Sequence, residues 1–105
     1  MTTNTARFSI GQIIHHRLFG YRGLIADVDP TFQLTAEWYE QVARSRPPKD
    51  QPWYHVLPDE ARHVTYVAER NLEADVSLEP IQHPLVEALF ERDDDGAYRL
   101  LANTH

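Results

Sequence analysis

The chain has 105 residues, of which 42% are hydrophobic and 25% charged, and this size and composition are typical of one soluble globular domain. It contains no cysteine, which excludes a disulfide framework, a zinc–thiolate site and a thiol nucleophile. The formal net charge is −6, and residues 73–105 account for all of it, because they carry eight acidic and two basic side chains.

The N-terminal residues, MTTNTARF, lack the apolar core of a secretion signal, and no segment approaches the roughly 18 apolar residues of a membrane span. We therefore expect a cytoplasmic protein. Composition and charge predict a flexible N-terminus at residues 1–7 and a compact domain at residues 8–72. The acidic residues 73–105 form an extension that is either packed on this domain or tethered to it.

The segment Ile10–Pro30 predicts a hairpin of two short strands. The first strand begins with the β-branched pair Ile13-Ile14, and Gly20 and Gly23 bracket the bend, where glycine permits a positive φ or a close backbone approach. Period-two alternation then assigns the second strand's side chains to two faces. One face holds Leu24, Ala26 and Val28, and the other holds Ile25 and Asp27.

A short helix is predicted after Thr35, which is a suitable N-cap. Trp38, Tyr39 and Val42 lie at helical spacing, and Pro47-Pro48 ends the helix. This much aromatic surface on an inserted helix predicts either a lid over an open barrel end or an oligomer contact. Since small barrels often associate to enlarge their core, we expect a homo-oligomer, with a trimer as one candidate.

A second hairpin follows the helix. Trp53–Leu57 is an aromatic, β-rich run between Pro52 and Pro58, and His63–Ala68 is the returning strand. Glu69–Leu72 predicts a single helical or 3₁₀ turn. Hairpins with one helical insertion and a closing turn predict a mainly β fold, a small and strongly bent SH3-like barrel. Closing the sheet would remove most of the unpaired strand edges.

Residues 84–101 permit two structures, so the C-terminal extension is predicted to be α/β. Pro84 can open a helix. Its apolar face would be formed by Leu85, Val86, Leu89 and Phe90. Alternatively, Asp95-Gly96 is a strong hairpin signal that would pair Ala88–Arg92 with Ala97–Leu101. We favour the helix slightly.

His15 and His16 are the first candidates for metal ligands. Because they are adjacent on a predicted strand, their side chains point to opposite faces and cannot hold one ion together. A third ligand would have to come from elsewhere, such as His55 or His63. We predict that one of the pair is buried or hydrogen-bonded and the other solvated, and we predict no metal site.

Asp27 and Asp29 share one face of a strand and form a candidate carboxylate pair. General acid–base catalysis also needs a cleft and a partner with a tuned pKa, and no companion nucleophile is visible in the sequence. We interpret the carboxylates as acceptors of backbone N–H groups where the strand ends. The sequence therefore predicts a non-enzymatic protein with no catalytic residue and no cofactor.

Aromatic side chains are concentrated in the second hairpin. Alternation sends Trp53 and His55 to one face of their strand and Tyr54 and Val56 to the other, and Tyr66 on the neighbouring strand completes a cross-strand aromatic pair. Such rings can stack on bases or surround a cationic ligand. In so small a domain core packing is the more frequent use, and it is the interpretation we adopt.

Contacts to a partner are expected from a few arginines and one aromatic side chain. Tyr21 is the expected exposed aromatic, because the corner on which it lies faces solvent. Scattered arginines in a chain with a pI near 5.4 predict weak, salt-sensitive DNA binding. We therefore rank protein binding above DNA binding. The interpretation that these arginines are solvated surface charges without a partner ranks above both. The candidate contacts are Arg17, Tyr21, Arg22, Arg62 and Arg70.

Four sequence segments, taken together, resemble one known family. They are Ile10-Gly11-Gln12, the HHRLFGYRGLIADVDP run from His15 to Pro30, the PWYHV strand at Pro52–Val56 and the TYVAERNL segment at Thr65–Leu72. In order and spacing they resemble the bacterial heat-shock HspQ family, also described as the hemimethylated-DNA-binding, YccV-like family. The resemblance spans Phe8 to Leu72.

The resemblance implies an SH3-like barrel without catalytic activity. It also implies two kinds of partner: hemimethylated DNA, and a Lon-type protease that degrades denatured proteins under heat stress and turns over the replication initiator. We favour an accessory factor in protein degradation, since the negative charge suits protein contacts better than DNA contacts. A DNA-binding module acting at hemimethylated sites is the alternative.

Overall fold

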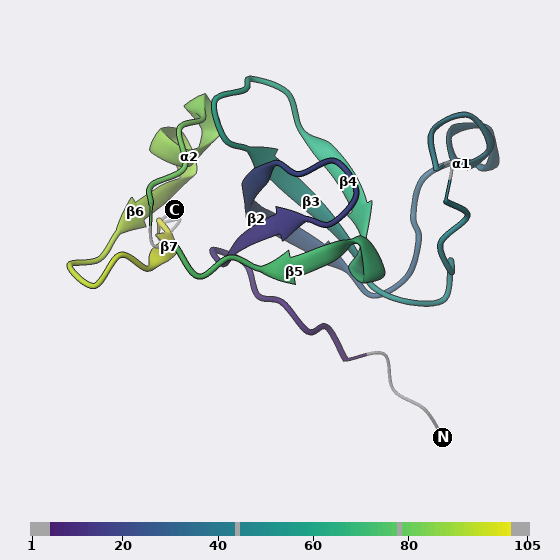
Figure 1. Ribbon diagram of the computed structural model, residues 1–105, viewed down its shortest axis with the longest axis horizontal. Helices are drawn as coiled ribbons and strands as arrows, with labels where there is room; N and C mark the ends of the chain where they lie inside the picture. Colours follow the sequence, from purple (N-terminus) through teal and green to yellow (C-terminus); the bar gives the residue numbers. More distant parts are fainter. Residues whose placement is uncertain (1–4, 44, 78, 102–105) are drawn as a thin grey trace, which may run out of the picture.

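The computed structural model describes residues 5–43, 45–77 and 79–101. In these residues the fold is mainly β, as predicted, with seven strands paired antiparallel, two short α-helices and one 3₁₀ turn (Figure 1). A central sheet lies between the helix α1 on one side and the helix α2 with strands β6 and β7 on the other. No helix among the described residues has the length and apolar character needed to cross a membrane.

The predicted first hairpin is confirmed as β1 (Ile13–His16) and β2 (Arg22–Asp29). The two glycines at the bend serve different purposes. Gly20 adopts a φ of +77°, which favours glycine in the turn. Gly23 instead permits close packing, because a Cβ there would lie 2.6 Å from a methyl carbon of Val56.

A β-bulge interrupts the predicted alternation of β2. Ile25 pairs with Val56 and Asp27 pairs with His55, so Ala26 is the extra residue. Leu24 and Ala26 belong to one hydrophobic cluster, as expected. Val28 packs against the other cluster, beside Ile25. The prediction that Val28 shares a face with Leu24 is wrong, because one inserted residue moves all later side chains to the opposite face.

The second hairpin and the strand after it complete a five-stranded sheet. β3 (Trp53–Pro58) pairs with β4 (Thr65–Ala68), the 3₁₀ turn η1 (Glu69–Asn71) follows, and β5 (Leu72–Ala74) pairs with β1. The strand order is β4-β3-β2-β1-β5, so β4 and β5 are the two edges and the sheet is open. A closed SH3-like barrel is therefore not confirmed, because β4 and β5 do not pair with each other or with another described strand on their outer sides.

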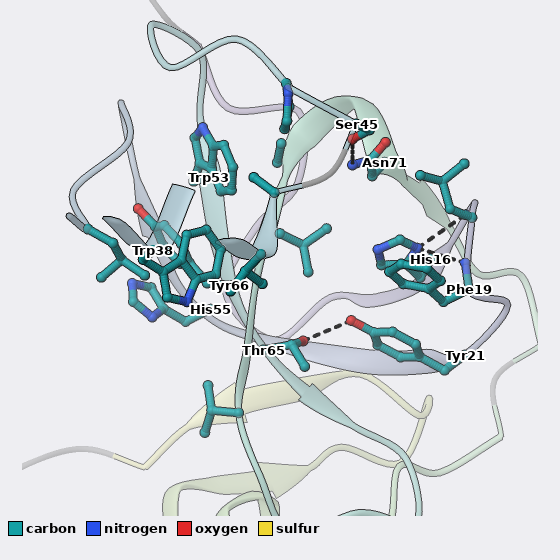
Figure 2. A pocket seen from close by; sticks show the side chains of 18 residues that line it. His16, Phe19, Tyr21, Trp38, Ser45, Trp53, His55, Thr65, Tyr66 and Asn71 are labelled. Carbon is teal, nitrogen blue, oxygen red and sulfur yellow. Dashed lines mark hydrogen bonds between the residues drawn. The ribbon is translucent and has the colours of Figure 1, made fainter. Parts of the chain in front are cut away.

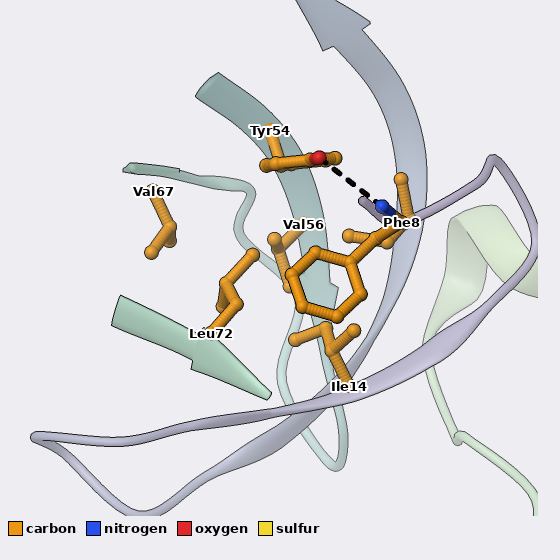
Figure 3. Packing of buried hydrophobic residues seen from close by; sticks show 7 residues of the cluster. Phe8, Ile14, Tyr54, Val56, Val67 and Leu72 are labelled. Carbon is orange, nitrogen blue, oxygen red and sulfur yellow. Dashed lines mark hydrogen bonds between the residues drawn. The ribbon is translucent and has the colours of Figure 1, made fainter. Parts of the chain in front are cut away.

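The main core lies on one face of this sheet (Figure 3). Tyr54 is fully buried there, and its hydroxyl accepts a bond from the backbone N–H of Phe8 at 3.3 Å and donates to Glu69 at 2.6 Å. The backbone N–H of Arg7 donates to the same Glu69 carboxylate at 2.9 Å. Within the predicted flexible N-terminus, residues 1–4 lie outside the described residues, while Arg7 is fixed by this network.

The C-terminal segment contains both of the structures that the sequence permitted. α2 (Pro84–Leu89) leads directly into β6 (Phe90–Arg92), which pairs with β7 (Tyr98–Leu100). The helix ends after six residues, so only part of its predicted apolar face is used. Val86 and Phe90 are buried in a second cluster, together with Ile13, Leu24, Leu57 and Ile81. Leu85 and Leu89, predicted on the same face, are exposed.

The inserted helix α1 (Ala36–Val42) begins as predicted, with the Thr35 hydroxyl accepting the N–H of Trp38 at 3.1 Å. It ends at Val42, earlier than the Pro47-Pro48 stop, with Ala43 as the C-cap. Tyr39 fixes the loop that follows, because its hydroxyl donates to the carbonyl of Pro47 at 2.6 Å.

Candidate functional site

A cavity of about 770 Å³ lies beside β4, between the β1–β2 turn and α1 (Figure 2). Its walls are mainly apolar and aromatic. One group of rings lies on the α1 side and a second group on the side of the β1–β2 turn. The rings used in the argument below are Trp38, Trp53 and Tyr66 in the first group and His16, Phe19 and Tyr21 in the second.

The first aromatic group is tightly packed. Trp53 is buried and stacks on Tyr66, with ring centroids 5.2 Å apart. Trp38, from α1, meets both rings edge to face, at 6.0 Å and 5.7 Å. The Trp53 indole N–H donates to the carbonyl of Pro48 at 3.1 Å. The predicted core role of these aromatics is confirmed for Trp53, and their outer surfaces also form a wall of the cavity.

A hydrogen-bond network holds the polar end of this wall. The Asp29 carboxylate accepts bonds from the Tyr66 hydroxyl at 2.7 Å and the His55 imidazole at 3.1 Å. Burial, and then the hydrogen bond to Asp29, raise the pKa of Tyr66. Asp27 accepts the backbone N–H of Val28 at 2.9 Å, as expected, whereas Asp29 binds side chains instead.

The ligand atoms of Asp27, Asp29 and His55 all lie within 4.8 Å of one another, which is close enough to ligate a divalent cation. The sequence prediction grouped the histidines with each other and missed this combination. It depends on the bulge, which brings Asp27 opposite His55 across the β2–β3 ladder. That displacement has no local signal in the sequence.

His16 organises the other side of the cavity. It is buried, and its Nδ1 accepts the backbone N–H groups of Leu18 and Phe19, both at 3.1 Å. Its ring stacks on Phe19 with centroids 4.6 Å apart. Burial, and then the neighbouring His15, lower the pKa of His16, so the neutral acceptor form is favoured. His15 points elsewhere, to Glu73 at 2.9 Å.

Exposed apolar side chains surround the cavity mouth. Leu18 is 59% exposed, Phe19 75%, Val42 54% and Val64 48%. The expectation that Tyr21 would be the exposed aromatic is wrong, because it is half-buried and its hydroxyl bonds to the Thr65 hydroxyl at 2.8 Å. Burial accordingly raises the pKa of Tyr21.

Phe19 is instead the exposed aromatic of this turn. The glycines at 20 and 23 suggested that Tyr21 and Arg22 occupy the tip, whereas hydrogen bonds to His16 shift the tip to Leu18 and Phe19. In the sequence, the only signal for this shifted tip is His16, which lies two residues before Leu18 and three residues before Phe19.

The predicted lid residues on α1 divide between two roles. Trp38 and Val42 line the cavity. Tyr39 is buried and serves as an anchor for the loop after the helix.

The four candidate arginines occupy different environments. Arg22 is held by Asp75 at 3.0 Å and Asp59 at 3.4 Å, and it also donates to the carbonyl of Glu79 at 2.7 Å. Its charge is therefore neutralised, and it fixes the chain that leads to α2. Arg70 donates to the carbonyl of Ser45, at the cavity rim. Arg17 and Arg62 are exposed.

Residues 6–97 match the family model described as "Hemimethylated DNA-binding protein YccV like". The match includes the central sheet, α1, α2 and β6, and ends at Ala97, immediately before β7. It is longer than the resemblance from Phe8 to Leu72, so the segment after β5 is part of the family pattern as well.

Proposed function

This chain belongs to the YccV-like family, and we propose that it is a non-enzymatic accessory factor that promotes the degradation of denatured proteins under heat stress. In this role it binds apolar segments of unfolded clients, the replication initiator among them, and presents them to a Lon-type protease. The protein acts by binding alone.

The observation that carries this proposal is the apolar cavity with its exposed apolar rim. Phe19, Val42 and Val64 lie in solvent around one opening, and a contiguous apolar surface of this kind on a small protein is typical of a binding site. Unfolded proteins expose aliphatic and aromatic side chains that folded proteins bury. A cavity of about 770 Å³ has the size and apolar lining of a ligand pocket, and it offers space for several such side chains.

Electrostatics favour a protein partner over DNA. The chain carries a net charge of −6, and Arg22, Arg46 and Arg99 form ion pairs with carboxylates. Phosphate binding needs several uncompensated positive charges on one surface. The arginines that could contact phosphate, because they have no carboxylate partner among the described residues, include Arg17, Arg62 and Arg70.

A degradation assay tests the proposal. A permanently unfolded model protein is incubated with a purified Lon-type protease and ATP, with and without this protein. We expect faster degradation with the wild type, and loss of most of that stimulation in the double variant Phe19→Ser/Val42→Ser. The control is Val76→Ser, which removes an apolar side chain that is 92% exposed but does not line the cavity. Equal stimulation by all three proteins would reject the proposal.

Binding of hemimethylated DNA is the second candidate function, and the family description favours it. Fluorescence anisotropy with hemimethylated, fully methylated and unmethylated duplexes, at low and at physiological salt, tests it. DNA recognition requires a preference for the hemimethylated duplex that persists at physiological salt. It also requires that Arg17→Ala, Arg62→Ala or Arg70→Ala weaken binding, while Arg46→Ala, which removes an arginine already paired with Glu40, does not.

A further inference from the structure

The outer edge of β4 offers unpaired backbone groups. Glu69 donates its N–H to the carbonyl of Pro52, and bonded pairs alternate along an antiparallel ladder, so Val67 and Thr65 bond to β3. Tyr66 therefore directs its N–H and C=O groups away from β3, toward the open edge. Ala68 is only 3% exposed, and as the N-cap of η1 its C=O accepts the first bond of that turn. Among the described residues, neither of the two Tyr66 groups has a hydrogen-bond partner.

The cavity runs along this same edge. All five consecutive residues from Val64 to Ala68 line it. Neighbouring side chains on a strand point to opposite faces, so a cavity over a single face would contact only every second residue. Contact with all five places the cavity at the strand edge, open to both faces. Figure 2 shows the Trp38–Tyr66 group on one side of this strand and the His16–Tyr21 group on the other.

Positive charge lies beyond both ends of β4. Arg62 precedes the strand and Arg70 follows it, and Arg17 adjoins Leu18 in the cavity wall. All three are exposed, and none is paired with a carboxylate among the residues that the structure describes. An occupant of the cavity therefore gains from acidic residues at its two ends.

We propose that an unfolded polypeptide binds here as an added β-strand on β4. Its backbone pairs with the open N–H and C=O groups of Tyr66, its apolar side chains enter the cavity on both sides of the strand, and acidic residues on its flanks meet Arg62 and Arg70. Such strand addition draws affinity from backbone bonds and selectivity from alternate side-chain pockets. This inference rests on the proposed function and specifies how the client is held.

Backbone N-methylation of a probe peptide tests the pairing. The probe is a fluorescently labelled ten-residue peptide with alternating valine and threonine at its centre and two aspartates at each end. Two further peptides of the same sequence carry the same number of N-methyl groups, one at the even central positions and one at the odd ones. Only every second amide of an added strand faces β4. One pattern of N-methyl groups therefore removes the peptide N–H donors that face β4, and the other removes those that face solvent.

We expect one N-methylated peptide to bind about tenfold more weakly than the probe, or worse, and the other to stay within about threefold. Arg62→Glu should weaken the unmodified probe, whereas Arg46→Glu, at an arginine paired with Glu40, should not. Equal binding of the two N-methylated peptides would overturn strand addition. A fall in the protein's sedimentation mass on binding would show that the peptide displaces a second copy from this edge, which would overturn the inference that the edge is open to an unfolded client.

The degradation assay separates this inference from the proposed function. Degradation that depends on Phe19 and Val42, with equal binding of both N-methylated peptides, would reject strand addition and keep the accessory role. Binding that differs between the two patterns, without stimulated degradation, would support the binding mode and reject the accessory role.

Discussion

At the scale of single residues, hydrogen bonds to two side-chain acceptors decide which side chains reach the cavity. His16 accepts two backbone N–H groups and so presents Leu18 and Phe19 to solvent. Asp29 performs the corresponding task on the other side, where it fixes the orientation of Tyr66 and His55. Removal of such an acceptor breaks two partly buried hydrogen bonds, each of which contributes about 0.5–1.5 kcal/mol.

Acidification is expected to destabilise the protein through His16. Burial lowers its pKa from 6.5 in the folded state, so below about pH 6.5 the unfolded chain binds a proton that the folded chain does not. The free energy of unfolding therefore falls as the pH falls, by at most about 1.4 kcal/mol per pH unit from this group. His16→Asn keeps an acceptor but does not titrate, so urea denaturation at pH 7.5, 6.5 and 5.5 should show a smaller loss. Parallel losses in the two proteins would contradict this role.

At the scale of elements, two irregularities in the sheet create the site. The bulge in β2 turns Asp27 and Asp29 toward His55, and the open edge of β4 leaves space along which the cavity forms. The third element is α1, whose Trp38 and Val42 complete the wall. With only seven residues, α1 depends on its cap and on its packing against the sheet.

Loss of the α1 cap should weaken the cavity wall. Thr35→Ala removes the acceptor for the N–H of Trp38 and is expected to destabilise the helix by about 1 kcal/mol. Hydrogen exchange should then become faster for amides 38–42, while the amides of β1 and β2 keep their protection. Thr35→Ser retains a capping hydroxyl and is the matched control. Uniformly faster exchange across the sheet would show that α1 is not an independent element.

At the scale of the whole molecule, two hydrophobic clusters lie on opposite faces of the sheet. The second cluster attaches α2 and β6 through Val86 and Phe90, and Arg22 fixes the connecting chain through Asp75 and Glu79. This packing leaves Val64, Thr65 and Tyr66 at the β4 edge partly exposed, whereas Val67 and Ala68 are buried. The expected homo-oligomer stays a prediction, to be checked by sedimentation.

Limited proteolysis should detect the attachment of the C-terminal segment. Residues 79–100 are expected to resist cleavage in the wild type. Phe90→Ala should cost about 3–5 kcal/mol of local stability, since it removes a large side chain from the second cluster, and should expose this segment to protease. Leu89→Ala removes an exposed neighbour and should leave the pattern unchanged. Equal cleavage of both variants would contradict the packing.

Local signals predicted most of the elements. Thr35 capped its helix, the Gly20 turn closed its hairpin, and Pro84 and Asp95-Gly96 each produced the structure that they favour. Those signals act within a few residues, so the sequence displays them directly. The mainly β class and the family followed from the same segments.

The sequence by itself determined most of the elements, the family and the acidic C-terminal third. Only the tertiary structure decided that the sheet is open at β4, that Phe19 and not Tyr21 is exposed, and that Arg22 is neutralised. These outcomes depend on contacts between residues far apart in the chain, such as Tyr21 with Thr65 and Arg22 with Asp75. Periodicity within one strand carries no information about such contacts, because a single bulge in a neighbouring strand changes which residues meet.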